Sequence, residues 1–520
     1  MATHFSLVQN KQEDLKKAKS IHNEKVNSLM KNVQFISCIS NFQPTTQLEK
    51  RMLFLIKLKL NETFSEELEA LKRQFAENVT KDVNQTFQIP FKEGILNGVE
   101  DLVVIDNKVQ VKTSRAFQDK IFQNAKSQVL LKEYYSICQD RCSENAEIVE
   151  KQLQLKHKLA LEQGYPSVLH QFTVDRMVGS VENLENFIQQ LETKFCEKYE
   201  SDLRKIQYPH QLTEYNIRTA FYESQMKLLD FDPHSVEKYF PQNSTISKIL
   251  KFLSNLLKFE FEEVKNSISW ADDLKSFAIK TSQKQCVVSF DLYQRADKYQ
   301  GGWFQKLNNQ HFSIQANFKK QENFTFDDVK TILHEIGHTL HAIYSNCSYK
   351  TLNAINVQWD FVEVPSQFFE YYSYEASFLL EFGLKQEEIG KIQQLKKVMN
   401  GWFLLTQLQK VKMDYLMHKS LTAKQLQSQL ANLNLFGQKQ TFQNVFLHLF
   451  GNNYDYTVGY YSYYYSEAVC VGLFEFVNGQ NCIQRFVDEI LAKGNQIPQN
   501  QLVEQFLGDK IDFDAYWKVL

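Results

Sequence analysis

The sequence has few of the two residues that most often interrupt regular structure. Of its 520 residues, only 17 are glycine and 8 are proline, both well below average usage. Loop-rich and all-β folds need these residues at their many turns, so such folds are disfavoured. Hydrophobic residues make up 43% of the chain and charged residues 23%, which is enough apolar surface to offset chain entropy. We expect an ordered, mainly α-helical protein.

An excess of charge of either sign is missing as well. The chain has 59 Lys and Arg against 61 Asp and Glu, a net charge of −2, and the two signs are intermingled. Nucleic acid and anionic lipid are bound by clustered basic residues, so we expect neither nucleic acid nor a membrane among its partners. The best apolar run, residues 52–60, contains lysines and is shorter than the roughly 18 residues that a membrane span needs.

Cysteine and targeting signals are also scarce. The eight cysteines lack zinc-knuckle spacing, which favours a reducing compartment. The first 50 residues contain no arginine but carry Glu13, Asp14 and Glu24, whereas transit peptides are rich in arginine and poor in acids. We expect a cytoplasmic or mitochondrial protein, with no targeting segment visible in this chain.

Hydrophobic spacing predicts helices through most of the chain. Three/four spacing of apolar residues indicates helices over residues 10–80 and again over 115–265. Residues 102–111 resemble a hairpin with Asp106-Asn107 at its turn. A second β patch is expected at 286–296 and 311–318, joined by a glycine-containing loop.

The segment 325–344, TFDDVKTILHEIGHTLHAIY, has the most specific local pattern. Thr325 and Asp328 have capping-box spacing, which predicts a helix start. His334 and His338, four positions apart, would stand one above the other on this helix and point at one ion, with Glu335 close enough to reach a water on it. The same helix would bury an apolar stripe of Val329, Ile332, Leu333, Ile336 and Leu340.

A catalytic zinc ion needs a third protein ligand and one open position. Glu363 is the best candidate, because an acid inside the apolar stretch 361–364 is costly unless it is paired or bound to metal. The alternative is a partly exposed glutamate at a helix N-terminus. Ser366, Gln367 and Glu370 follow on the side expected to orient the ligands by hydrogen bonds.

FDDVKTILHEIGHTLH, together with WDFVEVPSQFFE at 359–370, resembles the zinc metallopeptidase family of thimet oligopeptidase, oligopeptidase A and mitochondrial intermediate peptidase. Further segments follow in the family's order, so the resemblance covers residues 68–520. It implies one Zn²⁺ per chain, held by His334, His338 and Glu363, with Glu335 as general base.

The resemblance also implies an architecture. We expect two helical lobes enclosing a deep channel, a zincin-type HExxH helix and small β patches near the active site. Residues 1–67 would form an amino-terminal helical segment, and residues 68–520 the peptidase unit, with its catalytic core at about 280–480. Peptides would be the substrates and the protein a monomer.

Residues 454–467, YDYTVGYYSYYYSE, contain seven tyrosines in fourteen positions. A phenol is neutral at pH 7 yet can donate a proton, which suits an oxyanion formed during peptide hydrolysis. A helix expected to begin near Thr457 or Gly459 would put Tyr460 and Tyr463 on one face.

The resemblance assigns roles to residues of this region. Tyr463 and His448 would be catalytic donors, and Tyr460, with Tyr456 or Tyr454, would bind substrate. The stretch from His448 to Tyr463 is two or three residues longer than the family's pattern.

Three functions are compatible with these features. The first is an endopeptidase that hydrolyses internal bonds of short or unfolded peptides through metal-activated water. The second is a mitochondrial intermediate peptidase-like enzyme that trims imported precursors. The third is a catalytically silent scaffold, which predicts the loss of at least one of His334, Glu335, His338 and Glu363, yet all four are present.

Overall fold

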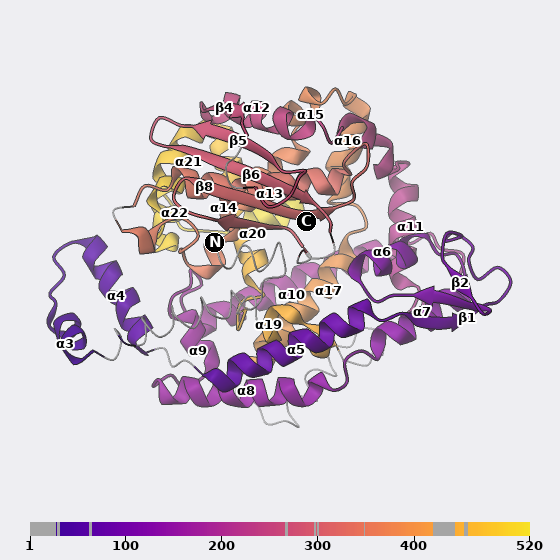
Figure 1. Ribbon diagram of the computed structural model, residues 1–520, viewed down its shortest axis with the longest axis horizontal. Helices are drawn as coiled ribbons and strands as arrows, with labels where there is room; N and C mark the ends of the chain where they lie inside the picture. Colours follow the sequence, from indigo (N-terminus) through magenta and orange to yellow (C-terminus); the bar gives the residue numbers. More distant parts are fainter. Residues whose placement is uncertain are drawn as a thin grey trace. The chain divides into compact units, whose positions relative to one another are not determined.

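Helices dominate the computed structural model of the chain (Figure 1), so the mainly α prediction is confirmed. The structure describes residues 28, 32–61, 65–265, 269–295, 298, 301–347, 349–419, 442–451 and 456–520. The helix expected at the start of the chain, over residues 11–32, lies almost wholly outside them. Within the described residues no helix has the length and apolarity to cross a bilayer.

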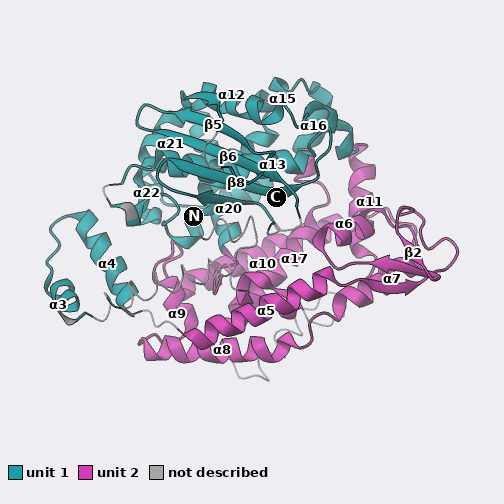
Figure 2. Cartoon of the chain, in the orientation of Figure 1, with its two compact units in different colours: residues 1–62, 232–393, 462–519 teal, residues 63–231, 394–461, 520 magenta. Residues whose placement is uncertain are grey.

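The chain divides into two compact units, and both are discontinuous in sequence (Figure 2). Unit 1 comprises residues 1–62, 232–393 and 462–519, and unit 2 comprises residues 63–231, 394–461 and 520. The boundary expected at residue 68 stays a prediction.

Unit 2 is built from helices and one small sheet. Its helices are α5 (Glu66–Asn84), α6 (Arg115–Asn124), α7 (Gln128–Gln139), α8 (Asn145–Glu162), α9 (Val168–Thr173), α10 (Val181–Leu203), α11 (Ile217–Leu229), α17 (Gly401–His418) and α19 (Leu447–Phe450). The sheet has the order β1-β3-β2, with β1 at Phe87–Pro90, β2 at Val104–Ile105 and β3 at Lys108–Val111. Asp106 and Asn107 link β2 to β3 with φ of 50° and 58°, so the predicted hairpin is confirmed.

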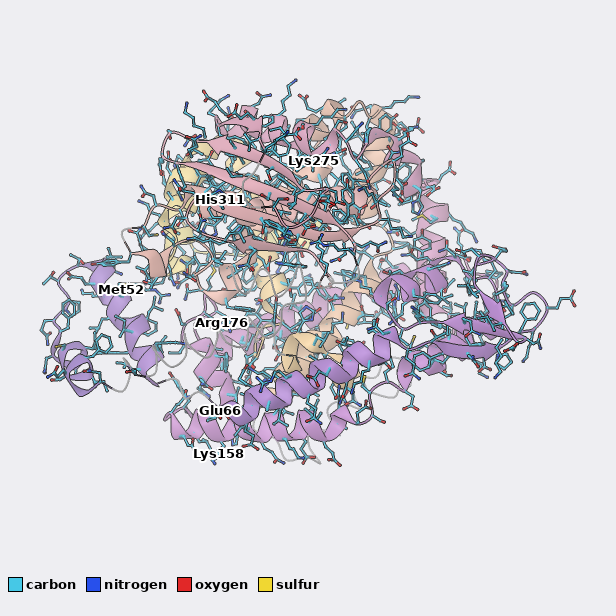
Figure 3. All side chains as sticks on the ribbon, in the orientation of Figure 1. Met52, Glu66, Lys158, Arg176, Lys275 and His311 are labelled. Carbon is cyan, nitrogen blue, oxygen red and sulfur yellow. The ribbon has the colours of Figure 1, made fainter. Side chains whose placement is uncertain are left out.

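Unit 1 contains a five-stranded sheet in the order β4-β5-β6-β8-β7. Its strands are β4 (Glu260–Glu263), β5 (Lys275–Lys280), β6 (Gln285–Tyr293), β7 (Trp303–Lys306) and β8 (His311–Phe318). Figure 3 labels Lys275 and His311, where β5 and β8 begin. All neighbours are antiparallel except β6 and β8, and β7 is an edge strand. The two strands expected from sequence are present, while β4 falls inside a stretch predicted to be helical.

Helices flank this sheet (Figure 1). The principal helices of unit 1 are α3 (Val33–Asn41), α4 (Gln47–Asn61), α12 (Thr245–Leu257), α13 (Phe326–Tyr344), α14 (Glu363–Tyr371), α15 (Ala376–Glu381), most of α16 (Gln386–Leu395), α20 (Ser462–Gln480), α21 (Ile483–Glu489), α22 (Gln499–Leu507) and α23 (Asp514–Val519). Helix α13 contacts β7, β8 and α14. It is therefore held between the edge of the sheet and a second helix.

The start of α13 is fixed as the sequence predicts. Thr325 Oγ1 accepts from the backbone N–H of Asp328, and the Asp328 carboxylate accepts from the N–H of Thr325. This capping box satisfies two donors that the helix end leaves free. The five residues of the predicted apolar stripe are all buried.

A glycine lets α13 and α14 approach closely. A Cβ built on Gly337 would lie 2.6 Å from Ser366 Cα and 2.7 Å from the Pro365 carbonyl oxygen. Both are backbone atoms that cannot rotate away. Only glycine therefore permits this packing, which brings the start of α14 to the histidine face of α13.

We expect Gly337→Ala to lower the free energy of unfolding by about 1–3 kcal/mol, because the added methyl overpacks two backbones. Gly390→Ala is the matched control, since Gly390 lies in α16 and a Cβ added there would meet no described atom within 4 Å. That change should be neutral or stabilise by up to about 1 kcal/mol. Urea unfolding measures both, and equal stability of the two variants would contradict this packing argument.

Candidate metal centre

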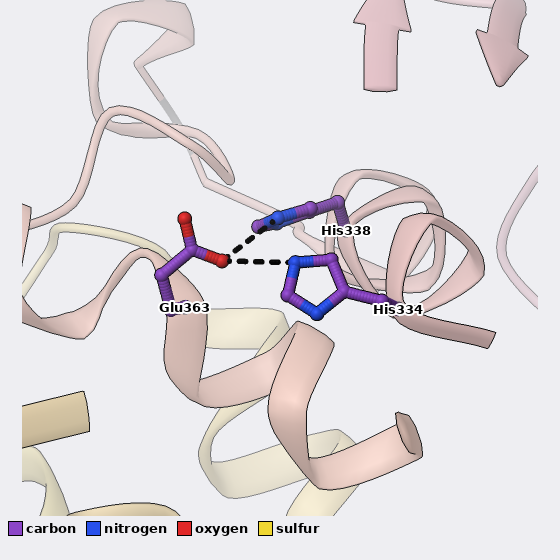
Figure 4. A group of neighbouring side chains, drawn as sticks. All are labelled: His334, His338 and Glu363. Atoms are coloured by element: carbon purple, nitrogen blue, oxygen red, sulfur yellow. Dashed lines mark ion pairs between the residues drawn. The ribbon is translucent and has the colours of Figure 1, made fainter. Parts of the chain in front are cut away.

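His334, His338 and Glu363 converge at one point in unit 1 (Figure 4). The two histidines lie one turn apart on α13, and Glu363 is the first residue of α14. Glu363 Oε2 lies 3.1 Å from His334 Nε2 and 3.2 Å from His338 Nε2. The three ligand atoms all lie within 4.8 Å of one another.

This group fits a zinc ion. Zinc binds imidazole nitrogen and carboxylate oxygen at roughly 2.0–2.2 Å in tetrahedral sites, so neighbouring ligand atoms stand about 3.3 Å apart. The two nitrogen–oxygen separations are close to that value. Three protein ligands would leave a fourth position for water or substrate.

Two neighbouring side chains orient the group. His334 Nδ1 lies 2.9 Å from Glu370 Oε2, which directs Nε2 towards Glu363. Ser366 Oγ donates to Glu363 Oε2 at 2.9 Å. Hydrogen bonds of this kind fix the tautomer and orientation of metal ligands.

Opposite charges perturb the acid and base properties of these groups. Burial lowers the pKa of His334, but hydrogen bonds to Glu363 and Glu370 outweigh it and raise that pKa well above its usual value. Burial raises the pKa of Glu363, but His338 and His334 outweigh it and hold that pKa well below the ordinary value. The carboxylate is therefore ionised, as a metal ligand must be.

Glu335 lies beside this group in a buried position. Its side chain is 6% exposed, and its Oε2 has no hydrogen-bond partner among the described residues. The N–H of Phe304 in β7 hydrogen-bonds to the carboxylate. Burial raises the pKa of Glu335, against the opposing effect of His334 and His338. A carboxyl group with a raised pKa is suited to exchange protons near neutral pH.

The third histidine of the helix is not part of the group. His341 is 1% exposed, and its ring lies 6.3 Å from that of Phe361. Neither ring nitrogen has a hydrogen-bond partner among the described residues. Burial and the neighbouring His338 lower its pKa to about 3. His341 is therefore a neutral residue packed in the core.

Tyr463 is tied to α14 through the backbone. It is the second residue of α20, and its carbonyl accepts from Gln367 Nε2 at 3.1 Å. Gln367 is four residues after Glu363, so this contact links the start of α20 to the helix that carries the carboxylate.

His448, Tyr456 and Tyr460 lie together in unit 2. The ring of His448 is 5.0 Å from that of Tyr456 and 5.6 Å from that of Tyr460. The Tyr460 hydroxyl donates to Gln407 Oε1 at 2.8 Å. Tyr454 lies outside the described residues, so its assignment stays a prediction.

The helix that follows these tyrosines begins later than expected. Helix α20 starts at Ser462, whereas the sequence pattern indicated a start near Thr457 or Gly459. Val458 has φ of 53°, and the Asp414 carboxylate accepts from the N–H groups of Val458 and Tyr460 at 3.0 and 2.9 Å. This turn stops the helix from extending backwards. Tyr460 therefore precedes α20, and the expectation that it shares a helix face with Tyr463 is wrong.

Several residues around these groups were not found from the sequence. They are Phe304 in β7, and Gln407, Lys410 and Asp414 in α17. Each acts on a residue at least 30 positions away, so no local spacing pattern marks it.

The model of peptidase family M3 matches residues 123–519, most of the chain. The chain belongs to peptidase family M3. This confirms the resemblance noted in the sequence.

Several curated peptidases are similar to the chain. The chain is 25% identical over 448 residues to oligopeptidase A of Escherichia coli, covering 75% of this chain and 65% of that protein. It is 23% identical over 518 residues to saccharolysin of Saccharomyces cerevisiae, covering 85% and 72%. A thimet-like oligopeptidase of Dictyostelium discoideum is 25% identical, with 72% and 64% covered. The chain thus spans just under two thirds of oligopeptidase A.

Solved structures share the fold of this M3 chain. A structure of PZ peptidase A with an inhibitor has a TM-score of 0.60 at 12% identity, covering 100% of this chain and 88% of the other. The carboxypeptidase of Pyrococcus furiosus has a TM-score of 0.56 at 11% identity, covering 100% and 95%. At such identities these likenesses concern the fold alone.

Proposed function

We propose that this chain is a zinc-dependent endopeptidase that hydrolyses internal bonds of short or unfolded peptides. The observation that carries the proposal is the convergence of two imidazoles and one carboxylate, with the buried Glu335 beside them. Membership of family M3 and the names of the relatives support it.

His334, His338 and Glu363 would hold one Zn²⁺ per chain, with Glu370 and Ser366 orienting them. Zinc, when bound, supplies Lewis acidity towards a peptide carbonyl and a water. Glu335 would take the proton from that water and pass it to the leaving amine.

Other side chains of this chain would stabilise the developing negative charge. We keep Tyr463 and His448 as donors to the oxyanion, and Tyr460, with Tyr456 or Tyr454, as substrate contacts. A fixed donor at an oxyanion contributes about 10²- to 10³-fold in kcat. The two lobes and deep channel implied by the resemblance would limit substrates to short or unfolded chains.

Metal removal tests the proposal. Dialysis against a zinc chelator should abolish cleavage of a quenched fluorescent peptide, and one equivalent of Zn²⁺ per chain should restore it, because three side chains define one site. Mass spectrometry of the products should show internal cleavage. Full activity in a chain shown to be free of metal would refute the proposal, whereas release of only terminal residues would replace the endopeptidase with an exopeptidase.

A further inference from the structure

Among the described residues, a lysine of unit 2 stands over two aromatic rings without a negative partner. Lys410 lies on α17, and its Nζ is 5.4 Å from the ring centre of Phe442 and 5.9 Å from that of Tyr460. In the described part of the chain, no hydrogen bond or ion pair reaches this Nζ. The residue is half-buried, and a partly desolvated ammonium without a counter-ion is costly.

Neighbouring lysines differ in this respect. Lys412, two residues along α17, pairs with Glu192, and Lys419 pairs with Glu185 at 3.2 Å. The absence of a described counter-ion at Lys410 is therefore not a general property of this helix.

The charged residues that lower the pKa of Lys410 are both positive. Burial, together with Arg115 and Arg218, lowers the pKa of Lys410 to about 8. Arg115 and Arg218 share a single carboxylate, that of Asp119. Among the described residues, the nearest acids are thus already engaged: Asp119 with the two arginines, and Asp414, one turn further along α17, with the backbone N–H groups of Val458 and Tyr460. With a pKa of about 8, Lys410 is still mostly protonated at pH 7.

Lys410 adjoins the side chains proposed to contact substrate. It faces the ring of Tyr460, and Gln407, which accepts from the Tyr460 hydroxyl, lies one turn earlier on α17. The side chain of His448 keeps contact with solvent, but partial desolvation of its ring, together with the nearby charges of Lys410 and Arg115, lowers its pKa to about 4. The neutral imidazole of His448 and the positively charged ammonium of Lys410 therefore both lie next to the ring of Tyr460.

We propose that Lys410 binds a carboxylate of the peptide substrate, either its free C-terminus or an acidic side chain. This rests on the proposed function, since it requires that Tyr460 and His448 contact a peptide. A carboxylate would supply the counter-ion that Lys410 lacks among the described residues, and charge-assisted hydrogen bonds are stronger than neutral ones. The alternative is that the lysine stem merely covers the two rings.

Matched peptides distinguish these roles. The zinc-loaded full chain is assayed on quenched fluorescent peptides that differ only as C-terminal acid or amide, and on peptides with Glu or Gln at each position around the cleaved bond. We expect the carboxylate member of at least one pair to have a kcat/KM about tenfold higher. Lys410→Met should bring that ratio to about one, whereas Lys410→Arg should retain it. The control Lys412→Met, on the same helix, should leave the ratio as in the wild type.

The inference is overturned if the ratio of kcat/KM between the carboxylate peptide and its neutral partner is the same in the wild type and in Lys410→Met. It is also overturned if Lys410→Met lowers kcat/KM equally for every peptide. The pair that responds shows which source of carboxylate is bound. Binding of the same peptides to Glu335→Gln and to Glu335→Gln/Lys410→Met, measured by fluorescence anisotropy, needs no turnover. It therefore separates a failure of carboxylate recognition from a failure of the peptidase function.

Discussion

Glu335→Gln is expected to lower kcat for peptide hydrolysis by about 1,000-fold while leaving the zinc content at one ion per chain. Glutamine has nearly the same shape as glutamate but cannot accept a proton, and general-base catalysis contributes about 10²- to 10⁴-fold. Glu335 is not one of the three residues whose ligand atoms converge, so the metal should remain. The loss should fall on kcat, with KM little changed.

Steady-state cleavage of a fluorescent peptide and elemental analysis of the same sample measure both quantities. Glu387→Gln is the matched control, because Glu387 is an exposed residue in the first turn of α16 and should behave as the wild type. A Glu335→Gln variant with its full zinc content and wild-type kcat would remove Glu335 from the mechanism.

Glu363→Ala is expected to weaken zinc binding by well over 100-fold and to abolish activity at ordinary zinc concentrations. Removing the carboxylate leaves only two of the three ligand side chains, His334 and His338. Even partners that merely orient ligands are worth about 10- to 100-fold in affinity. Glu370→Gln, which alters only such a partner of His334, should therefore fall between the wild type and Glu363→Ala.

Competition with a zinc-binding dye measures this series. The order of affinities should be wild type, then Glu370→Gln, then Glu363→Ala. If Glu363→Ala bound zinc as tightly as the wild type, Glu363 would not be a ligand, and the alternative of a glutamate at a helix N-terminus would hold.

The features of α13 were predictable because they are local. The capping box spans four residues, and the four-residue spacing of His334 and His338 is close to one helical turn. The same holds for the apolar stripe and for the hairpin at Asp106-Asn107. Each of these features depends on the geometry of a single helix or hairpin, so the local sequence pattern is enough to predict it.

The approach of Glu363 to these histidines is a different matter. Its position inside an apolar stretch marks Glu363 as an unusual acid, but this position does not show which residues the carboxylate contacts. The distance depends on Gly337, whose missing side chain lets the backbone of α14 pack against α13. A close approach of two helices is a tertiary property, and no periodicity in either segment expresses it.

The surroundings of the tyrosines were the least predictable part. The Asp414 carboxylate binds backbone groups 44 and 46 residues later. It fixes a turn where local spacing favoured continuation of the helix. Lys410 is likewise separated from Tyr460 by 50 positions, so its contact with the ring follows from packing and not from any motif. The sheet order, with β6 and β8 side by side and parallel, is long-range in the same way.

The Asp414 carboxylate accepts hydrogen bonds from the backbone N–H groups of Val458 and Tyr460. These two hydrogen bonds hold the backbone of Tyr460 to α17. Related sequences that differ in length upstream of Val458 could therefore still present the phenol at the same place. The two or three additional residues between His448 and Tyr463 that the family resemblance implies would be a difference of this kind.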